Sequence, residues 1–152
     1  MDKERLIDLL NDLVEINKDS QEEFKEAAEN VSSPELKRFF NQESEIRGRM
    51  LKDLQAEVLR MNAEPDWQGS VEGALERAWL DLKELFGTND QSILESVEAE
   101  EDDAVAGYER VLKEPFPQDL LNLLHQQYVS IKAVHDHIRA LRDSGNYKAK
   151  TV

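Results

Sequence analysis

The sequence predicts an all-α protein built as a bundle of four long helices. Apolar residues recur three and four positions apart over four long segments, which is the period of an amphipathic helix. The four prolines and six glycines fall mainly between those segments, where loops are expected. No segment shows the strict apolar–polar alternation of a half-buried strand, so we expect no sheet.

The first two helices are expected to form a hairpin, with helix 2–30 joined by a very short turn to helix 34–61. Ser33 can cap the second helix, and Pro34 suits its first turn because the fixed φ of proline is helical there. The expected core stripe of the first helix is Leu6, Leu9, Leu10, Leu13, Ile16, Phe24, Ala27 and Val31, and that of the second is Leu36, Phe39, Phe40, Ile46, Met50, Leu54, Val58 and Met61.

The second hairpin is expected to consist of helix 91–113 and helix 117–143, turned by Pro115 and Pro117. The connection before it is long and contains a short amphipathic helix, residues 70–86. A long crossover between two helical hairpins is typical of ferritin-like four-helix bundles. The alternative is an up-down bundle with a decorated loop.

The domain organisation expected from this pattern is simple. Residues 1–143 form a single bundle domain, and residues 144–152 form a flexible polar tail.

Composition excludes several classes of function. The chain has 33 acidic and 19 basic residues and a net charge of −14, which argues against binding nucleic acid or an anionic membrane surface. It has no cysteine, so disulfides, thiol catalysis and cysteine-ligated metals are excluded. The charged first ten residues do not match a signal peptide, and no stretch is long and apolar enough to span a membrane. A cytoplasmic protein is expected.

Ionisable residues are expected to face the core of the bundle at one depth. At about 100° per residue, Glu43 and Glu101 fall near the centres of their apolar stripes, His135 lies between two isoleucines, and Glu23 and Glu98 lie at the stripe edges. If the crossover makes the second and third helices parallel, all five side chains share a layer about one helical turn thick.

One hypothesis for this layer is a metal site made by Glu23, Glu43, Glu98, Glu101 and His135. Carboxylates and one imidazole suit iron, manganese or zinc. A di-iron centre needs Glu-x-x-His from two helices, but all three histidines lie on the last helix, so the usual ligand set is incomplete. A complete di-iron set therefore cannot be assembled in the usual way, whereas a single-metal or degenerate site can, and the sequence gives no indication of an enzymatic reaction.

The other hypothesis is a metal-free structural or protein-interaction bundle. Arg47 follows Glu43 by four residues on the same face and can bridge it to Glu101. Buried charges must be neutralised, and a guanidinium does this as well as a metal does. In this case the crossover helix or an apolar seam is expected to make the contact of a homodimer.

Short motifs along the chain resemble those of an uncharacterised bacterial family of ferritin-like four-helix proteins, catalogued as a domain of unknown function. The resemblance spans residues 5 to 143. The motifs are Asp19-Ser20 with Phe24 and Ala27-Ala28-Glu29, Leu54-Gln55-Ala56-Glu57, Gly69-Ser70 with Gly73-Ala74 and Trp79, Ile93-Leu94-Glu95 with Glu98 and Glu101-Asp102, and Gln127-Tyr128 with Lys132, His135-Asp136 and Leu141-Arg142-Asp143.

This resemblance implies a ferritin-like fold, a bacterial cytoplasmic setting and a role in stress responses, but no established activity. Four polar positions are carried over by it, namely Glu98, Glu101, Asp102 and His135. The sequence departs from the family pattern in the crossover, where Glu76 replaces the start of an expected histidine-arginine pair. It also departs in the first helix, where Ser20 and Glu23 replace common glycines.

Overall fold

The computed structural model describes residues 1–63 and 89–148. These residues form four helices joined by turns and contain no strand. The helices are α1 (Lys3–Asn30), α2 (Pro34–Arg60), α4 (Asp90–Val111) and α5 (Gln118–Asp143). Their bounds lie within two residues of those expected from hydrophobic periodicity, so the all-α bundle is confirmed. The short helix predicted at residues 70–86 lies outside the described residues.

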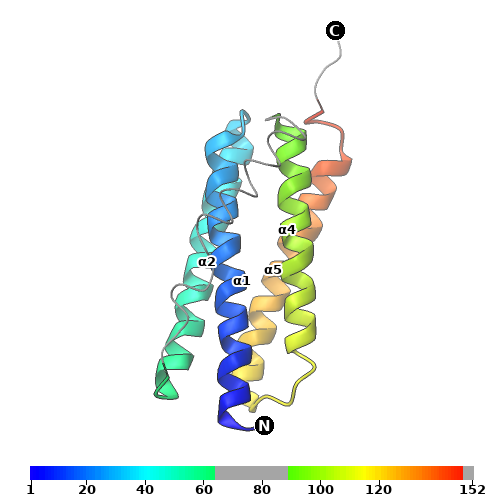
Figure 1. Cartoon of the computed structure of the whole chain (residues 1–152). Coiled ribbons are helices and arrows are strands. Elements are labelled where there is room, and N and C mark those ends of the chain that lie inside the picture. The colour runs from blue at the N-terminus through cyan, green and yellow to red at the C-terminus, as the bar shows by residue number, and fades with distance from the viewer. Residues whose placement is uncertain (64–88, 149–152) are drawn as a thin grey trace.

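The four helices form two antiparallel hairpins that pack side by side (Figure 1). α1 and α2 form one hairpin, and α4 and α5 form the other. α2 ends at one end of the bundle and α4 begins at the other, so α2 and α4 run parallel, as the long crossover predicted. α1 packs against α4 and links the two hairpins.

Side chains cap the N-termini of three helices. Asp2, Ser33 and Asn89 each accept a hydrogen bond from the backbone N–H three residues later, and so satisfy a donor that the helix leaves unpaired. Ser33 and Pro34 therefore start α2 as the sequence predicted. Asp90 adds a tertiary cap, because its carboxylate accepts hydrogen bonds from the backbone N–H groups of Ser32 and Ser33 at 2.7 and 2.9 Å.

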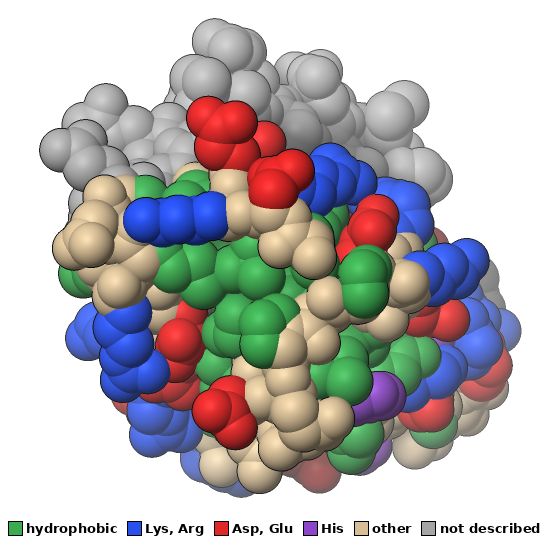
Figure 2. Space-filling view, turned by 90° about the horizontal axis from the view of Figure 1, so that it is seen from below, with side chains coloured by type: hydrophobic (Ala, Val, Ile, Leu, Met, Phe, Trp, Pro, Cys, Tyr) green, Lys and Arg blue, Asp and Glu red, His purple; other side chains and the backbone are tan. Residues whose placement is uncertain are grey.

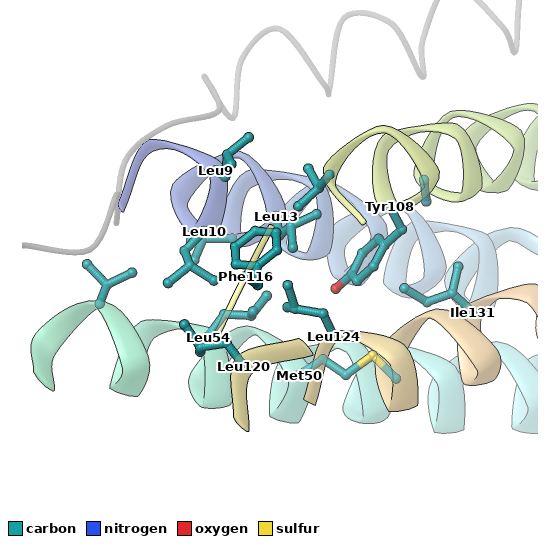
Figure 3. Packing of buried hydrophobic residues seen from close by; sticks show 14 of the residues in the cluster. Leu9, Leu10, Leu13, Met50, Leu54, Tyr108, Phe116, Leu120, Leu124 and Ile131 are labelled. Atoms are coloured by element: carbon teal, nitrogen blue, oxygen red, sulfur yellow. The ribbon is translucent and has the colours of Figure 1, made fainter. Parts of the chain in front are cut away.

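The apolar stripes form two separate core clusters, one in each half of the bundle. The lower core cluster lies at the end with the N-terminus, where Leu10, Leu54 and Leu124 come together from three helices (Figure 3). The upper core cluster lies at the opposite end. Its buried members are Phe24, Ala27, Ala28, Val31, Leu36, Phe40, Ile93, Leu94, Val97 and Ile138. Seen from the end of the bundle with the N-terminus, apolar side chains gather at the centre and charged ones at the rim (Figure 2).

A chain of buried hydrogen bonds ties all four helices together beside the lower core cluster. Nδ2 of Asn17 on α1 donates to the Tyr108 hydroxyl of α4 at 2.7 Å, and that hydroxyl donates to Oε1 of Gln127 on α5 at 2.7 Å. Nε2 of Gln127 then donates to the carbonyl of Met50 on α2 at 3.3 Å. The groups that link the four helices are paired with one another, so the chain helps to fix the register of the helices. Oδ1 of Asn17 is buried and has no hydrogen-bond partner among the described residues.

Replacing Tyr108 by phenylalanine is expected to lower the free energy of unfolding by about 1–3 kcal/mol, because Oε1 of Gln127 loses its donor inside the core. Urea unfolding measures this loss. Tyr128→Phe removes the same atom from a half-buried tyrosine beside the same cluster and should change stability by less than about 0.5 kcal/mol. Equal effects of the two substitutions would contradict the role of the hydrogen-bond chain.

Beyond α5, Tyr147 packs against the upper core cluster, and residues 149–152 lie outside the described residues. The flexible tail therefore stays a prediction. Within residues 1–63 and 89–148, no helix has the length and apolar character that crossing a membrane requires.

Candidate functional site

A layer of buried polar side chains separates the two core clusters. Each helix passes from one apolar cluster to the other through this layer, so its ionisable residues lie on the stripe that faces the core. We call this set the central polar layer; its members are Ser20, Glu23, Glu43, Ser44, Arg47, Glu98, Glu101 and His135, and all of them are buried. The five side chains predicted from the sequence to face the core thus all do so, whereas their role as metal ligands stays a prediction.

The centre of the layer is an ion pair between Arg47 of α2 and Glu101 of α4. Nη2 of Arg47 lies 2.5 Å from Oε2 of Glu101, and both side chains are 0 % exposed. The guanidinium also lies over the ring of Phe24, 5.3 Å from its centroid. Arg47 therefore neutralises Glu101, as the second hypothesis predicted, but it forms no salt bridge to Glu43, which that hypothesis expected it to bridge as well.

Two further carboxylates stand near this pair without forming a salt bridge to it. Burial raises the pKa of Glu43, and the charge of Arg47 offsets part of that rise. Glu23 accepts a hydrogen bond from the Ser96 hydroxyl at 3.3 Å, and burial together with the charge of Glu100 raises its pKa to about 8. Burial likewise raises the pKa of Glu100 to about 7. At neutral pH Glu23 therefore mostly keeps its proton, and Glu100 beside the layer is about half protonated.

A second group lies where α4 meets α5. Glu98, Asp102 and His135 each offer one ligand atom, and these atoms all lie within 4.8 Å of one another. Glu98 and Asp102 are four residues apart and share one face of α4, and Asp102 directly contacts Nε2 of His135. Glu98 and His135 are buried, whereas Asp102 is half exposed, so the group opens to solvent on one side.

The orientation of His135 follows from its contacts on both ring nitrogens. Nδ1 lies 3.0 Å from Oδ1 of Asp136, a distance at which an Nδ1–H donates to the carboxylate. The hydrogen bonds from His135 and Lys132 lower the pKa of Asp136, so that carboxylate stays ionised. An imidazole held in this way directs Nε2 toward Asp102, so Nε2 is the nitrogen that would be available to a metal, as is common for metal-ligating histidines.

Two arginines of α5 complete the surroundings of Glu98. Nε of Arg139 lies 3.2 Å from Oε1 of Glu98, and Arg142 forms an ion pair with Oε2 of the same carboxylate. Nη2 of Arg139 also lies 3.7 Å from Oδ1 of Asp102. The two oxygens of Glu98 therefore face two different cations.

The structure sorts the five predicted residues into different surroundings. Glu98 and His135 join a compact group of ligand type, Glu101 pairs with Arg47, and Glu43 and Glu23 belong neither to that group nor to the ion pair. The ligand set expected from the sequence did not include Asp102, although the family resemblance named it among the polar positions carried over. Its spacing of four residues from Glu98 was the signal that could have identified it.

Comparison with known proteins places most of the chain in one family. A family model with the description "Domain of unknown function (DUF2383)" matches residues 5–114, which is well over half of the chain. The matched segment includes α1 except its first two residues, all of α2 and α4, and both carboxylates of the α4–α5 group, whereas His135 lies outside it. No curated protein matches the sequence.

Proposed function

The chain belongs to the family described as "Domain of unknown function (DUF2383)", and we propose that this member is a ferritin-like bundle that binds a divalent metal ion. The ligands are Glu98, Asp102 and His135. The observation that carries the proposal is the convergence of three ligand atoms of suitable chemistry within 4.8 Å.

The geometry of this group suits a metal after a small rearrangement. Oxygen and nitrogen ligands lie about 2.0–2.2 Å from zinc, so neighbouring ligand atoms of a tetrahedral site are about 3.4 Å apart. The ligand atoms that lie up to 4.8 Å apart need to approach by about 1 Å to reach that spacing. Asp102 and Nε2 of His135 are already in direct contact and need to move apart to admit the ion. Two carboxylates also match the charge of a divalent ion, and Asp136 supports His135 from behind.

The donor set narrows the choice of metal. One imidazole and two carboxylates suit iron(II), manganese(II) or zinc(II), and three protein ligands leave positions open for water. Glu23, Glu43 and Glu101, which completed the set expected from the sequence, serve in this proposal as buried polar groups beside the site. The long crossover with parallel α2 and α4 supports the ferritin-like relationship. A bacterial cytoplasmic setting and a role in stress responses rest on the family resemblance alone.

The second candidate function is a metal-free structural or protein-interaction bundle that associates with a second copy of itself. The observation in its favour is the Arg47–Glu101 ion pair, which neutralises core charge without a metal. The two candidates differ in one measurable property, because only the first gains stability from added metal.

Zinc is expected to bind with a stoichiometry near one per chain and to raise the melting temperature. At a free concentration of 100 times Kd, the gain in unfolding free energy is about 2.7 kcal/mol. Isothermal titration and thermal melts with and without a chelator measure both effects, and elemental analysis of the purified protein identifies the resident metal. The metal-free candidate predicts no metal in the protein and a melt that the chelator does not move.

The substitution His135→Ala is expected to abolish the zinc-induced rise in melting temperature. His125→Ala is the matched control, because His125 is an exposed histidine on the same helix. The rise is compared within each variant, so any loss of intrinsic stability cancels. A zinc effect that survives in His135→Ala would rule out this ligand assignment.

A further inference from the structure

We propose that Arg139 is a built-in competitor for the metal and that it must leave the site before a divalent ion can bind. This inference rests on the proposed function of the α4–α5 group. Its starting observation is that one guanidinium contacts all three proposed ligands. Nε of Arg139 lies 3.2 Å from Oε1 of Glu98. Nη2 of Arg139 lies 3.7 Å from Oδ1 of Asp102 and 3.4 Å from Nε2 of His135.

The position of this guanidinium is the position that a metal would take. The three ligand atoms lie within 4.8 Å of one another, and a guanidinium nitrogen of Arg139 already contacts each of these side chains. The guanidinium and a metal ion cannot both occupy that position, since they would repel each other at contact distance. Metal binding is therefore an exchange of one cation for another.

Displacing Arg139 is expected to cost little free energy, because its side chain is half exposed. Its side chain is 48 % exposed, and ion pairs at such sites contribute little to stability. The arginine can turn into solvent without leaving a buried charge of its own unpaired. In the metal-free protein Arg139 helps to neutralise the buried carboxylate of Glu98, which would otherwise have one cationic partner fewer.

Arg142 has a different role, although it lies only three residues further along α5. It pairs with Oε2 of Glu98, whereas Arg139 pairs with Oε1. Arg142 also pairs with Asp143 at 2.9 Å, away from the other two ligands. It can therefore stay in place when the metal binds Oε1 and hold the Glu98 carboxylate in orientation. Arg142 is a positioning residue, and Arg139 is a competitor.

Titration of the full-length protein with Co²⁺, followed by the visible absorption of the bound ion, tests this distinction. Arg139→Gln is expected to bind Co²⁺ about fivefold more tightly than the wild type, because the competing ion pair is gone. Arg142→Gln is expected to bind about tenfold more weakly, because the ligand carboxylate loses its support. Arg49→Gln, an exposed substitution on α2 with the same change in net charge, should bind as the wild type does.

The outcomes separate this inference from the proposed function. Binding in the wild type with no gain in Arg139→Gln overturns the competitor role and leaves the metal site standing. An equal gain in all three variants shows a general charge effect and also overturns it. If neither the wild type nor Arg139→Gln binds Co²⁺, the metal site itself is refuted, and the competitor role falls with it.

Discussion

Replacing Arg47 by methionine is expected to lower the free energy of unfolding at neutral pH by about 3–5 kcal/mol, the usual cost of removing one partner from a buried ion pair. Both Arg47 and Glu101 are 0 % exposed, so water cannot take the place of the lost guanidinium. Glu43 also loses the positive charge that offsets its burial. Chemical unfolding of the variant and the wild type measures the difference directly.

Two further variants make this test specific to the ion pair. Arg47→Met combined with Glu101→Gln removes both charges and is expected to recover much of the lost stability, because a buried pair replaced as a unit costs far less than a broken one. Arg49→Met changes an exposed arginine on the same helix and should alter stability by less than about 0.5 kcal/mol. An unchanged melting temperature of Arg47→Met would contradict the claim that the Arg47–Glu101 ion pair stabilises the metal-free bundle.

Replacing Glu23 by glutamine is expected to stabilise the protein at pH 8 by roughly 2–4 kcal/mol, because each unit of pKa shift corresponds to about 1.4 kcal/mol. Burial and the neighbouring Glu100 raise the pKa of Glu23 from 4.5 to about 8. The folded protein therefore holds a proton between these two values that the unfolded chain has already lost. Stability from this group is complete below pH 4.5 and is lost progressively as the pH rises toward 8.

Glutamine cannot lose a proton, so Glu23→Gln removes this part of the pH dependence. The free energy of unfolding, measured at intervals between pH 5 and pH 8.5, should fall less steeply in the variant than in the wild type. The slope that remains includes Glu100, whose pKa burial raises to about 7. Glu29→Gln makes the same charge change at an exposed position of α1 and should leave the slope unchanged. Parallel pH profiles of Glu23→Gln and the wild type would contradict the protonated state of Glu23.

These two predictions also bear on how the layer tolerates its excess of carboxylates. The described residues of the layer include four glutamates, and Arg47 pairs with one of them. Glu23 is protonated and carries no charge at neutral pH. Arg139 and Arg142 of α5 neutralise Glu98. The core charge is thus balanced by three separate means, and only the balance at Glu98 involves a cation that solvent can reach.

The sequence predicted the elements of this protein closely because helix formation is governed by local rules. Ser33 and Pro34 start α2 through contacts within four residues, and the apolar period of 3.6 identifies the buried stripe of each helix without knowledge of its neighbours. The same period placed Glu43, Glu101 and His135 on the core face, where the structure has them. The parallel course of α2 and α4 followed from the length of the crossover.

What only the tertiary structure decided is which charged groups meet. Sequence alone allowed Glu98 and Glu101 to share one site, but the structure turns Glu101 toward Arg47 and Glu98 toward Arg139 and Arg142. A step of one residue rotates a side chain by about 100° and moves it by 1.5 Å, so such pairings depend on the rotation and stagger of helices that are far apart in sequence. Those quantities arise from the packing of the two core clusters as a whole, and no short segment of the chain encodes them.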